Sequence, residues 1–208
     1  MLEQHWLVTC ESEDLFLRKQ TQRLNYMERF EELKKELLKR AKDADACKEQ
    51  YARAYNTQTL EQLMDVCRDN FSWACNNAVL DIDIITQYRN EFALGNIYAN
   101  ENVINGFLLC SNANVSAWGY TIVEAYDNAV VEAYGSTSVR THGNVTVEAW
   151  NCVIVEVYGS ATVRAHDYAY ITSYSTIEAK LSDDAIYRIR SNNTIKYANP
   201  KMKFELVE

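Results

Sequence analysis

The sequence of 208 residues lacks the segments that would direct a chain into a membrane or out of the cell. It has no run of about 18 apolar residues, the length that a membrane-spanning helix needs. Its first residues, MLEQHWLVTCESEDLF, contain neither a basic stretch nor a long apolar stretch before a small-residue cleavage site. These absences predict a cytoplasmic protein that makes no membrane contact.

Catalytic and metal-binding motifs are missing as well. The six cysteines form no CxxC pair, so the sequence indicates neither a zinc site nor a disulfide framework, and we expect reduced, mostly buried thiols. No GxSxG, HExxH, phosphate-loop or dinucleotide-binding pattern occurs. Two of the three histidines, His142 and His166, stand at positions of a repeat that elsewhere holds aromatic rings. We therefore predict a protein that is not an enzyme and that holds no cofactor or metal.

What the chain does have is an octapeptide repeated without slippage from residue 115 onward. Its first position is a branched aliphatic residue, its third is a small residue and its fourth is a ring. The first positions are Val115, Val123, Val131, Val139, Val147, Val155, Val163 and Ile171. The rings are Trp118, Tyr126, Tyr134, His142, Trp150, Tyr158, His166 and Tyr174. Self-similarity at a fixed period is typical of a solenoid of stacked coils.

Apolar and polar residues alternate within each octapeptide, which is the pattern of a strand with one buried face. The aliphatic and small positions would form the interior, and the charged second position would face solvent. The charged positions are Glu124, Glu132, Arg140, Glu148, Glu156 and Arg164. The fifth position supplies a corner, because Gly, Asp and Asn accept positive φ or hydrogen-bond locally. The corners are Gly119, Asp127, Gly135, Gly143, Asn151, Gly159 and Asp167.

The number of octapeptides in each coil has two solutions. Two octapeptides give a flat, two-sided coil, in which Arg140 lies between Glu124 and Glu156 at the strand spacing of about 4.8 Å. Three octapeptides give a three-sided coil, which the near-repetition of VEAYGSTSVRTHG as VEVYGSATVRAHD supports. The longer period would stack Arg140 on Arg164, at a cost of up to about 1 kcal/mol. This repulsion and the narrow interior that the alanines imply favour the two-sided coil.

Charge is dense before the repeat, and apolar residues recur there at helical spacing. We expect a long helix at about 12–43 and two further helices at about 60–78 and 83–92. Thr59 and Gln62 have the spacing of a capping box at the start of the second helix.

The predicted fold class is therefore α+β: a single-stranded β-solenoid of octapeptide repeats with a helical N-terminal domain capping it. The helical domain would occupy residues 1–100, and the solenoid with its C-terminal cap residues 101–208. A solenoid exposes its interior at both ends, so each end needs a cap. The two later helices are candidates for the first cap, and Pro200, the only proline, discourages strand addition at the other end.

The phrases VEAYGST, VRTHGN and VEVYGSATVRAHD resemble the VEAYGSATVRAYG-type octapeptide repeats of otherwise uncharacterised bacterial and phage proteins. The resemblance covers about half of the chain. It implies a β-helix, and it supplies no activity and no site residue.

Two sets of side chains on the repeat are candidates for binding. The acidic column consists of Glu124, Glu132, Glu148 and Glu156. The aromatic ladder consists of Trp118, Tyr126, Tyr134, Trp150 and Tyr158. Rigid exposed rings anchor protein or sugar partners, although stacking along the ladder would explain them equally well. A carboxylate column could imitate the charge of DNA, or it could serve solubility alone.

We therefore predict a non-catalytic protein-interaction module that displays a rigid solenoid surface, for which a phage or mobile-element origin is one candidate. One alternative is an acidic DNA mimic that inhibits a DNA-binding or defence enzyme, and another is a sugar-binding fibre or adhesin. The main prediction includes a protein partner and no direct contact with nucleic acid. The long N-terminal helix is a candidate for self-association as a coiled coil.

Overall fold

The structure is a computed structural model in which residues 18, 20 and 26–201 are described. By its internal contacts the chain divides into two compact units, residues 1–66 and 67–208. The boundary that we predicted near residue 100 follows the change from helix to strand. The contacts instead place the helical segment after residue 66 in the same unit as the strands.

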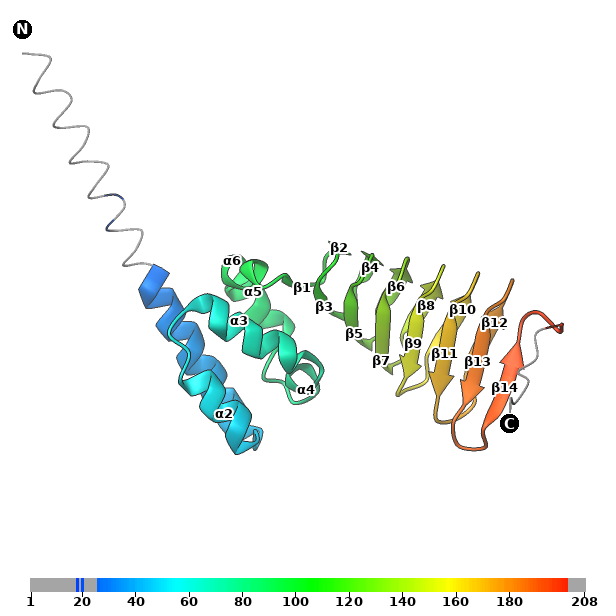
Figure 1. Cartoon of the computed structure of the whole chain (residues 1–208), viewed down its shortest axis with the longest axis horizontal. Coiled ribbons are helices and arrows are strands. Elements are labelled where there is room, and N and C mark those ends of the chain that lie inside the picture. The colour runs from blue at the N-terminus through cyan, green and yellow to red at the C-terminus, as the bar shows by residue number, and fades with distance from the viewer. Residues whose placement is uncertain (1–17, 19, 21–25, 202–208) are drawn as a thin grey trace, which may run out of the picture. The chain divides into compact units, whose positions relative to one another are not determined.

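The first unit is helical (Figure 1). It contains a helix over 26–43, α2 (Lys48–Tyr55) and most of α3 (Leu60–Asp69). The helix over 26–43 buries Phe30, Leu33 and Leu37, at helical spacing. Most of the predicted segment before residue 26 lies outside the described residues. The sequence did not predict α2, which has no buried residue and therefore no apolar stripe to recognise.

The start of α3 has the capping arrangement that the sequence predicted. The backbone N–H of Gln62 donates to Thr59 Oγ1 at 3.3 Å. The Gln62 side chain reaches back one residue further than in the usual capping box, because its Oε1 accepts from the N–H of Gln58 at 2.7 Å. The amide of Gln62 in the first turn and that of Gln58 just before the helix thereby find partners.

Three short helices open the second unit: α4 (Phe71–Asn76), α5 (Ile82–Gln87) and α6 (Arg89–Leu94). The two single helices predicted over 60–78 and 83–92 are each divided in two. The divisions fall at Asn70 and Tyr88, whose backbones are not helical. Apolar spacing alone does not reveal such a division, because the apolar positions on either side of it remain buried. Within the described residues, no helix is both long enough and apolar enough to cross a bilayer.

From β1 to β13 successive strands alternate between two sheets, so that one coil contributes one strand to each (Figure 1). The eight-stranded sheet contains β1 (Ile97–Ala99), β3 (Phe107–Ser111), β5 (Ile122–Asp127), β7 (Ser138–Gly143), β9 (Ile154–Val157), β11 (Tyr170–Ser173), β13 (Ile186–Ile189) and β14 (Thr194–Tyr197). The six-stranded sheet contains β2 (Val103–Ile104), β4 (Asn114–Trp118), β6 (Val130–Ala133), β8 (Thr146–Ala149), β10 (Thr162–Ala165) and β12 (Glu178–Leu181). All pairings are parallel except that of β13 with β14.

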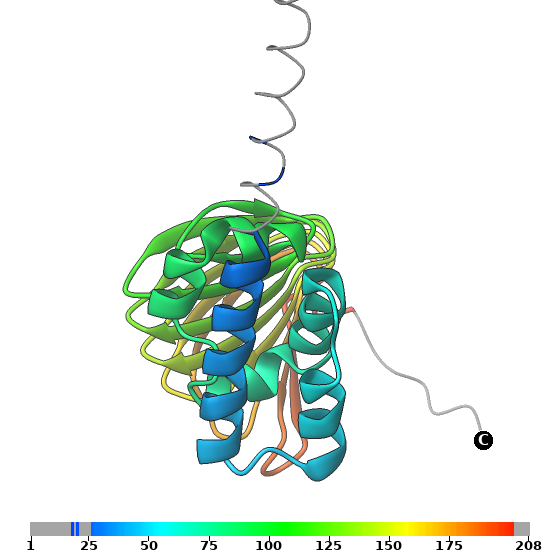
Figure 2. The same ribbon diagram turned by 90° about the vertical axis from the view of Figure 1, so that its left-hand side faces the viewer.

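The register confirms the β-solenoid and its two-sided coil. Val123 pairs with Val139, and Val139 with Val155, so each coil takes 16 residues. Coils of equal length place like residues above like, and successive coils lie one behind another with a gradual offset (Figure 2). The first two coils are shorter, since Ile97 pairs with Phe107 and Phe107 pairs with Ile122.

The solenoid interior is narrow and apolar. The aliphatic first positions and the small third positions are buried along the whole repeat. Two threonines at the seventh position, Thr121 and Thr137, are also fully buried. Their hydroxyls donate to the carbonyl oxygens of Trp118 and Tyr134 at 2.6 and 2.7 Å, which removes the cost of burying them.

The corners behave largely as the sequence predicted. Six of the seven predicted corner residues have φ between 54° and 96°. Gly159 is the exception, and glycine is required there by space. A Cβ atom at this position would collide with the backbone nitrogen and oxygen of Gly143 in the preceding coil.

Helices pack against the first coil of the solenoid, and an antiparallel strand ends the eight-stranded sheet at the other end. At the first coil, α5 and α6 lie against β1, and the ring of Phe71 in α4 packs edge-on against Phe107 with centroids 5.2 Å apart. At the other end β14 runs antiparallel to β13. The last strand of the six-stranded sheet carries exposed Glu178 and Lys180, and charges on an edge strand oppose further pairing.

Candidate functional site

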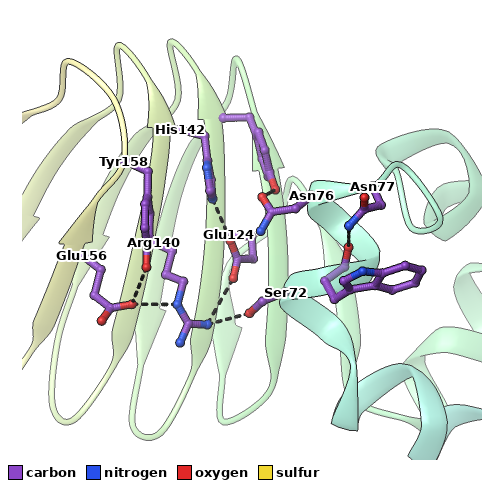
Figure 3. Close-up of polar contacts among 10 residues, drawn as sticks. Ser72, Asn76, Asn77, Glu124, Arg140, His142, Glu156 and Tyr158 are labelled. Atoms are coloured by element: carbon purple, nitrogen blue, oxygen red, sulfur yellow. Dashed lines mark hydrogen bonds and ion pairs between the residues drawn. The ribbon is translucent and has the colours of Figure 1, made fainter. Parts of the chain in front are cut away.

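The outer face of the eight-stranded sheet carries an alternating charge column. Arg140 lies between Glu124 and Glu156 on neighbouring strands, as the two-sided coil predicted (Figure 3). Its Nη1 is 3.3 Å from Glu124 Oε1, and its Nε is 2.8 Å from Glu156 Oε2. The hydrogen bond to Glu156 is the main reason why the pKa of Arg140 lies above its usual value. Within this column both carboxylates are therefore paired with the one guanidinium.

Glu124 is buried, which corrects the prediction that it faces solvent. Its side chain points outward from β5, but it is 0% exposed. Its second oxygen accepts from His142 Nε2 at 3.0 Å, so both carboxylate oxygens have cationic or polar partners. A buried carboxylate needs such partners, because an unpaired charge is costly away from water.

Helix α4 packs over the outer face of this sheet at β5 and β7. Arg140 Nη1 donates to Ser72 Oγ at 2.5 Å, and the hydroxyl of Tyr126 donates to Asn76 Oδ1 at 2.7 Å (Figure 3). We refer to Ser72, Asn76, Glu124, Tyr126, Arg140 and His142 as the α4 polar cluster, of which Glu124 is the buried member. The sequence carried no signal for it, because α4 is about 50 residues away along the chain.

The phenol of Tyr126 in this cluster and the thiol of Cys75 beside it are held in their neutral forms. Burial, with the nearby Cys75 and Glu124 as smaller causes, raises the pKa of Tyr126 well above its usual range. Burial and the Glu124 carboxylate likewise raise the pKa of the Cys75 thiol. A thiol with a raised pKa is a poor nucleophile at neutral pH. The arrangement suits a structural contact between α4 and the sheet.

The outer face of the six-stranded sheet carries a different column. Glu132 on β6 and Glu148 on β8 are register neighbours. Arg164 on β10 follows Glu148, and Lys180 on β12 follows Arg164. The predicted acidic column is thus divided, with two members on each sheet. The octapeptide pattern identified Arg164 as an outward charge but not Lys180, which continues the same column 16 residues after Arg164.

The rings form two ladders, one along each sheet, as the two-sided coil predicted. On the six-stranded side, Trp118 stacks on Tyr134 with centroids 5.9 Å apart, and Trp150 on His166 at 3.8 Å. On the eight-stranded side, His142 stacks between Tyr126 and Tyr158 at 4.5 and 5.4 Å. The five predicted ladder residues are therefore divided between the two faces. In these four pairs the ring planes lie within 12° of parallel, so neighbouring rings occupy each other's faces.

Hydrogen bonds link the charges and rings of the six-stranded side. The hydroxyl of Tyr134 and that of Ser116 both donate to Glu132 Oε2 at 3.4 Å. His166 Nδ1 lies 2.8 Å from Ser182 Oγ, and its Nε2 lies 3.5 Å from Glu148 Oε1. Exposed Glu132, Arg164 and Lys180 nevertheless leave most of the charge open to solvent.

The cysteines and acidic groups suggest no metal centre. Within the part of the chain that is described, no group of three His, Cys, Asp or Glu side chains could hold a metal ion. Cys67, Cys75 and Cys110 are buried, whereas Cys47 and Cys152 are exposed; all five are free thiols, and Cys10 lies outside the described residues. Burial raises the pKa of Cys67 and of Cys110 to about 12.

No family model, curated protein or solved structure matches the chain. We define the six-stranded face as the outward charge column and the ring ladder of that sheet. Its members are Ser116, Glu132, Glu148, Arg164, Lys180, Trp118, Tyr134, Trp150 and His166.

Proposed function

We propose that the chain is a non-catalytic protein-interaction module that binds a partner protein through the six-stranded face. The observation that carries this proposal is the fixed placement of charges and stacked rings on hydrogen-bonded parallel strands. Neighbouring strands hold their side chains about 4.8 Å apart. A surface that is already ordered loses little conformational entropy when a partner binds, which favours recognition.

The state of the ionisable groups supports a role without catalysis. Glu124 is engaged by Arg140 and His142, so it is not free to act as a general base. The thiols of Cys67 and Cys110 are buried with pKa values of about 12. Neither the carboxylate nor these thiols are therefore presented to a substrate in a reactive form.

The two alternative functions gain less support from the geometry. Duplex DNA carries one negative charge per about 1.7 Å, whereas here Arg140 separates Glu124 from Glu156 and Arg164 follows Glu148. A sugar stacks on an open ring face, and in each of the four stacked pairs the two rings cover one face of each other. Both alternatives stay hypotheses.

An affinity capture from host-cell lysate tests the proposed function. The test variant is Glu132→Gln with Glu148→Gln, which keeps the shape of the six-stranded face and removes its acidic half. We expect at least about tenfold weaker capture of the partner, because removing two interfacial charges costs on the order of 1–2 kcal/mol.

The matched control is Glu49→Gln with Glu61→Gln, two exposed residues of α2 and α3. It makes the same change in net charge and should capture the partner as the unmodified chain does. Equal capture by all three proteins would place the binding site elsewhere, and the absence of any specifically captured protein would contradict a separate partner.

A further inference from the structure

The charge column of the six-stranded face is ordered in two blocks. Along β6, β8, β10 and β12 the outward residues at one register position are Glu132, Glu148, Arg164 and Lys180. Two negative charges are followed by two positive charges at equal spacing. Such a column is complementary to the same column read in the opposite direction.

We propose that the partner of the six-stranded face is a second copy of this chain, bound face to face in a two-fold symmetric dimer. This inference rests on the proposed function, since it names the occupant of the same surface. The symmetry axis runs parallel to the strands and passes between β8 and β10. An interface of this kind uses one surface patch on both copies, so the patch must be complementary to itself.

The order of charges selects this axis. A two-fold axis lying in the interface can run along the strands or across them. An axis across the strands would place Glu132 opposite Glu132 of the second copy, which is repulsive. An axis along the strands reverses the stacking order of one copy. It places Glu148 opposite Arg164 and Glu132 opposite Lys180, and two-fold symmetry gives each pair twice.

Two further pairs of outward residues beside the axis accept the same arrangement, and farther from the axis Val130 faces Glu178. In the ring column the axis places Trp150 opposite His166, and both rings keep their stacking within their own ladder. In the column that precedes the charges, it places Thr146 opposite Thr162, which are themselves register neighbours in one copy. No like charges are brought together in either of these pairs.

The size of the surface sets the expected strength. Four strands of four residues cover about 13 by 14 Å between strand axes, since strands rise about 3.3 Å per residue and lie about 4.8 Å apart. Stable interfaces typically bury about 800 Å² on each partner, which is more than such a patch supplies. We therefore expect a weak dimer that depends strongly on ionic strength, because exposed ion pairs are screened by salt.

Sedimentation equilibrium of the full chain tests the dimer. In low salt, at about 20 mM, we expect reversible dimers, with a dissociation constant at least about tenfold higher in 500 mM salt. The variant Glu132→Lys with Glu148→Arg makes the column entirely basic. The variant Arg164→Glu with Lys180→Glu makes it entirely acidic. Each variant alone should bind itself at least about 100-fold more weakly than the unmodified chain.

An equimolar mixture of the two variants provides the decisive measurement. The basic column of one variant is complementary to the acidic column of the other, so the mixture should form heterodimers in low salt. This recovery also shows that both variants are folded. The control Glu49→Lys with Glu61→Lys makes the same charge change as the basic variant away from the six-stranded face, and it should dimerise like the unmodified chain.

Three outcomes would overturn the inference: an unmodified chain that stays monomeric in low salt, a mixture that does not associate, or variants that dimerise as the unmodified chain does. The last result would favour pairing through the N-terminal helix. If the chain is monomeric yet captures a lysate protein through Glu132 and Glu148, the second copy is excluded while the interaction function stands. If neither dimer nor captured protein depends on these residues, both proposals fail.

Discussion

The two outer faces of the solenoid are built from the same octapeptide but use their charges differently. On the eight-stranded face, Glu124, Arg140 and Glu156 alternate in sign and satisfy one another. On the six-stranded face, Glu132 and Glu148 form one block, and the basic residues follow as another. The comparison shows that a repeat fixes where a charge stands, whereas the order of signs decides whether that charge is used within the chain or offered to another molecule.

The aromatic ladders do not explain this difference, because stacked rings occur on both faces. The difference is explained by α4, which lies over the eight-stranded side only. Its Ser72 hydrogen-bonds to Arg140, and its Asn76 hydrogen-bonds to Tyr126. One face therefore contributes to holding the second unit together, and the other presents exposed charges.

Replacing one arginine on each face should show the largest difference in stability between the two faces. Arg140→Met leaves the carboxylate of Glu124 buried with the His142 ring as its remaining side-chain partner. We expect a loss of about 2–4 kcal/mol in the free energy of unfolding, measured by chemical denaturation. Arg164→Met on the exposed face is the matched control and should change this free energy by less than about 0.5 kcal/mol. Equal losses in the two variants would show that the faces do not differ in this way.

The corner that leads from the eight-stranded to the six-stranded side at Gly159 tests how tightly adjacent coils pack. Gly159→Ala adds a methyl group against the backbone of Gly143, and backbone atoms have little room to move. We expect a destabilisation of about 1–3 kcal/mol, read as a lower thermal midpoint. Ser160→Ala, at the exposed neighbouring position, should leave the midpoint nearly unchanged. A Gly159→Ala variant as stable as its control would mean that adjacent coils can separate easily at this corner.

Removing one carboxylate from each face should change the free energy of unfolding by less, and in opposite directions on the two faces. Glu156→Gln weakens the ion pair with Arg140, and we expect a loss of roughly 0.5–1 kcal/mol in the free energy of unfolding. Glu132→Gln relieves the repulsion between register neighbours Glu132 and Glu148, so it should be neutral or stabilising by a few tenths of a kcal/mol. Denaturation in low salt measures both variants. Opposite signs are expected, and equal destabilisation would contradict the division into paired and unpaired columns.

The smallest expected effect concerns acid stability at the corner that follows β12. Hydrogen bonds from the Ser182 hydroxyl and from the Asp167 amide lower the pKa of Asp183 below its usual value. A carboxyl with a lowered folded-state pKa stabilises the fold above its unfolded pKa of about 3.9, and this contribution is lost as pH falls through the folded value. Asp183→Asn should therefore flatten the fall in stability below about pH 4.

The charge-matched control for this measurement is Asp83→Asn on α5. Denaturation midpoints are compared at neutral and acid pH for both variants and for the unmodified chain. An unchanged acid dependence in Asp183→Asn would show that its hydrogen bonds contribute nothing to stability.

Much of the solenoid could be predicted because its determinants are local and repeated. The alternation of Val123, Glu124 and Ala125 sets the inward and outward directions, and the recurrence every eight residues sets the strand length. The choice of 16 residues per coil followed from the repulsion that a longer coil would create at Arg140. The stacked ladders followed from the same register, since like rings then lie above one another.

Only the tertiary structure decided which outward residues are covered. Glu124 and Glu132 occupy equivalent positions of the repeat, yet the first is buried and the second is exposed. The difference arises because α4 lies over the eight-stranded side at β5 and β7, a contact between segments about 50 residues apart. Local periodicity determines the direction in which a side chain points, but whether solvent or another segment lies there depends on long-range packing.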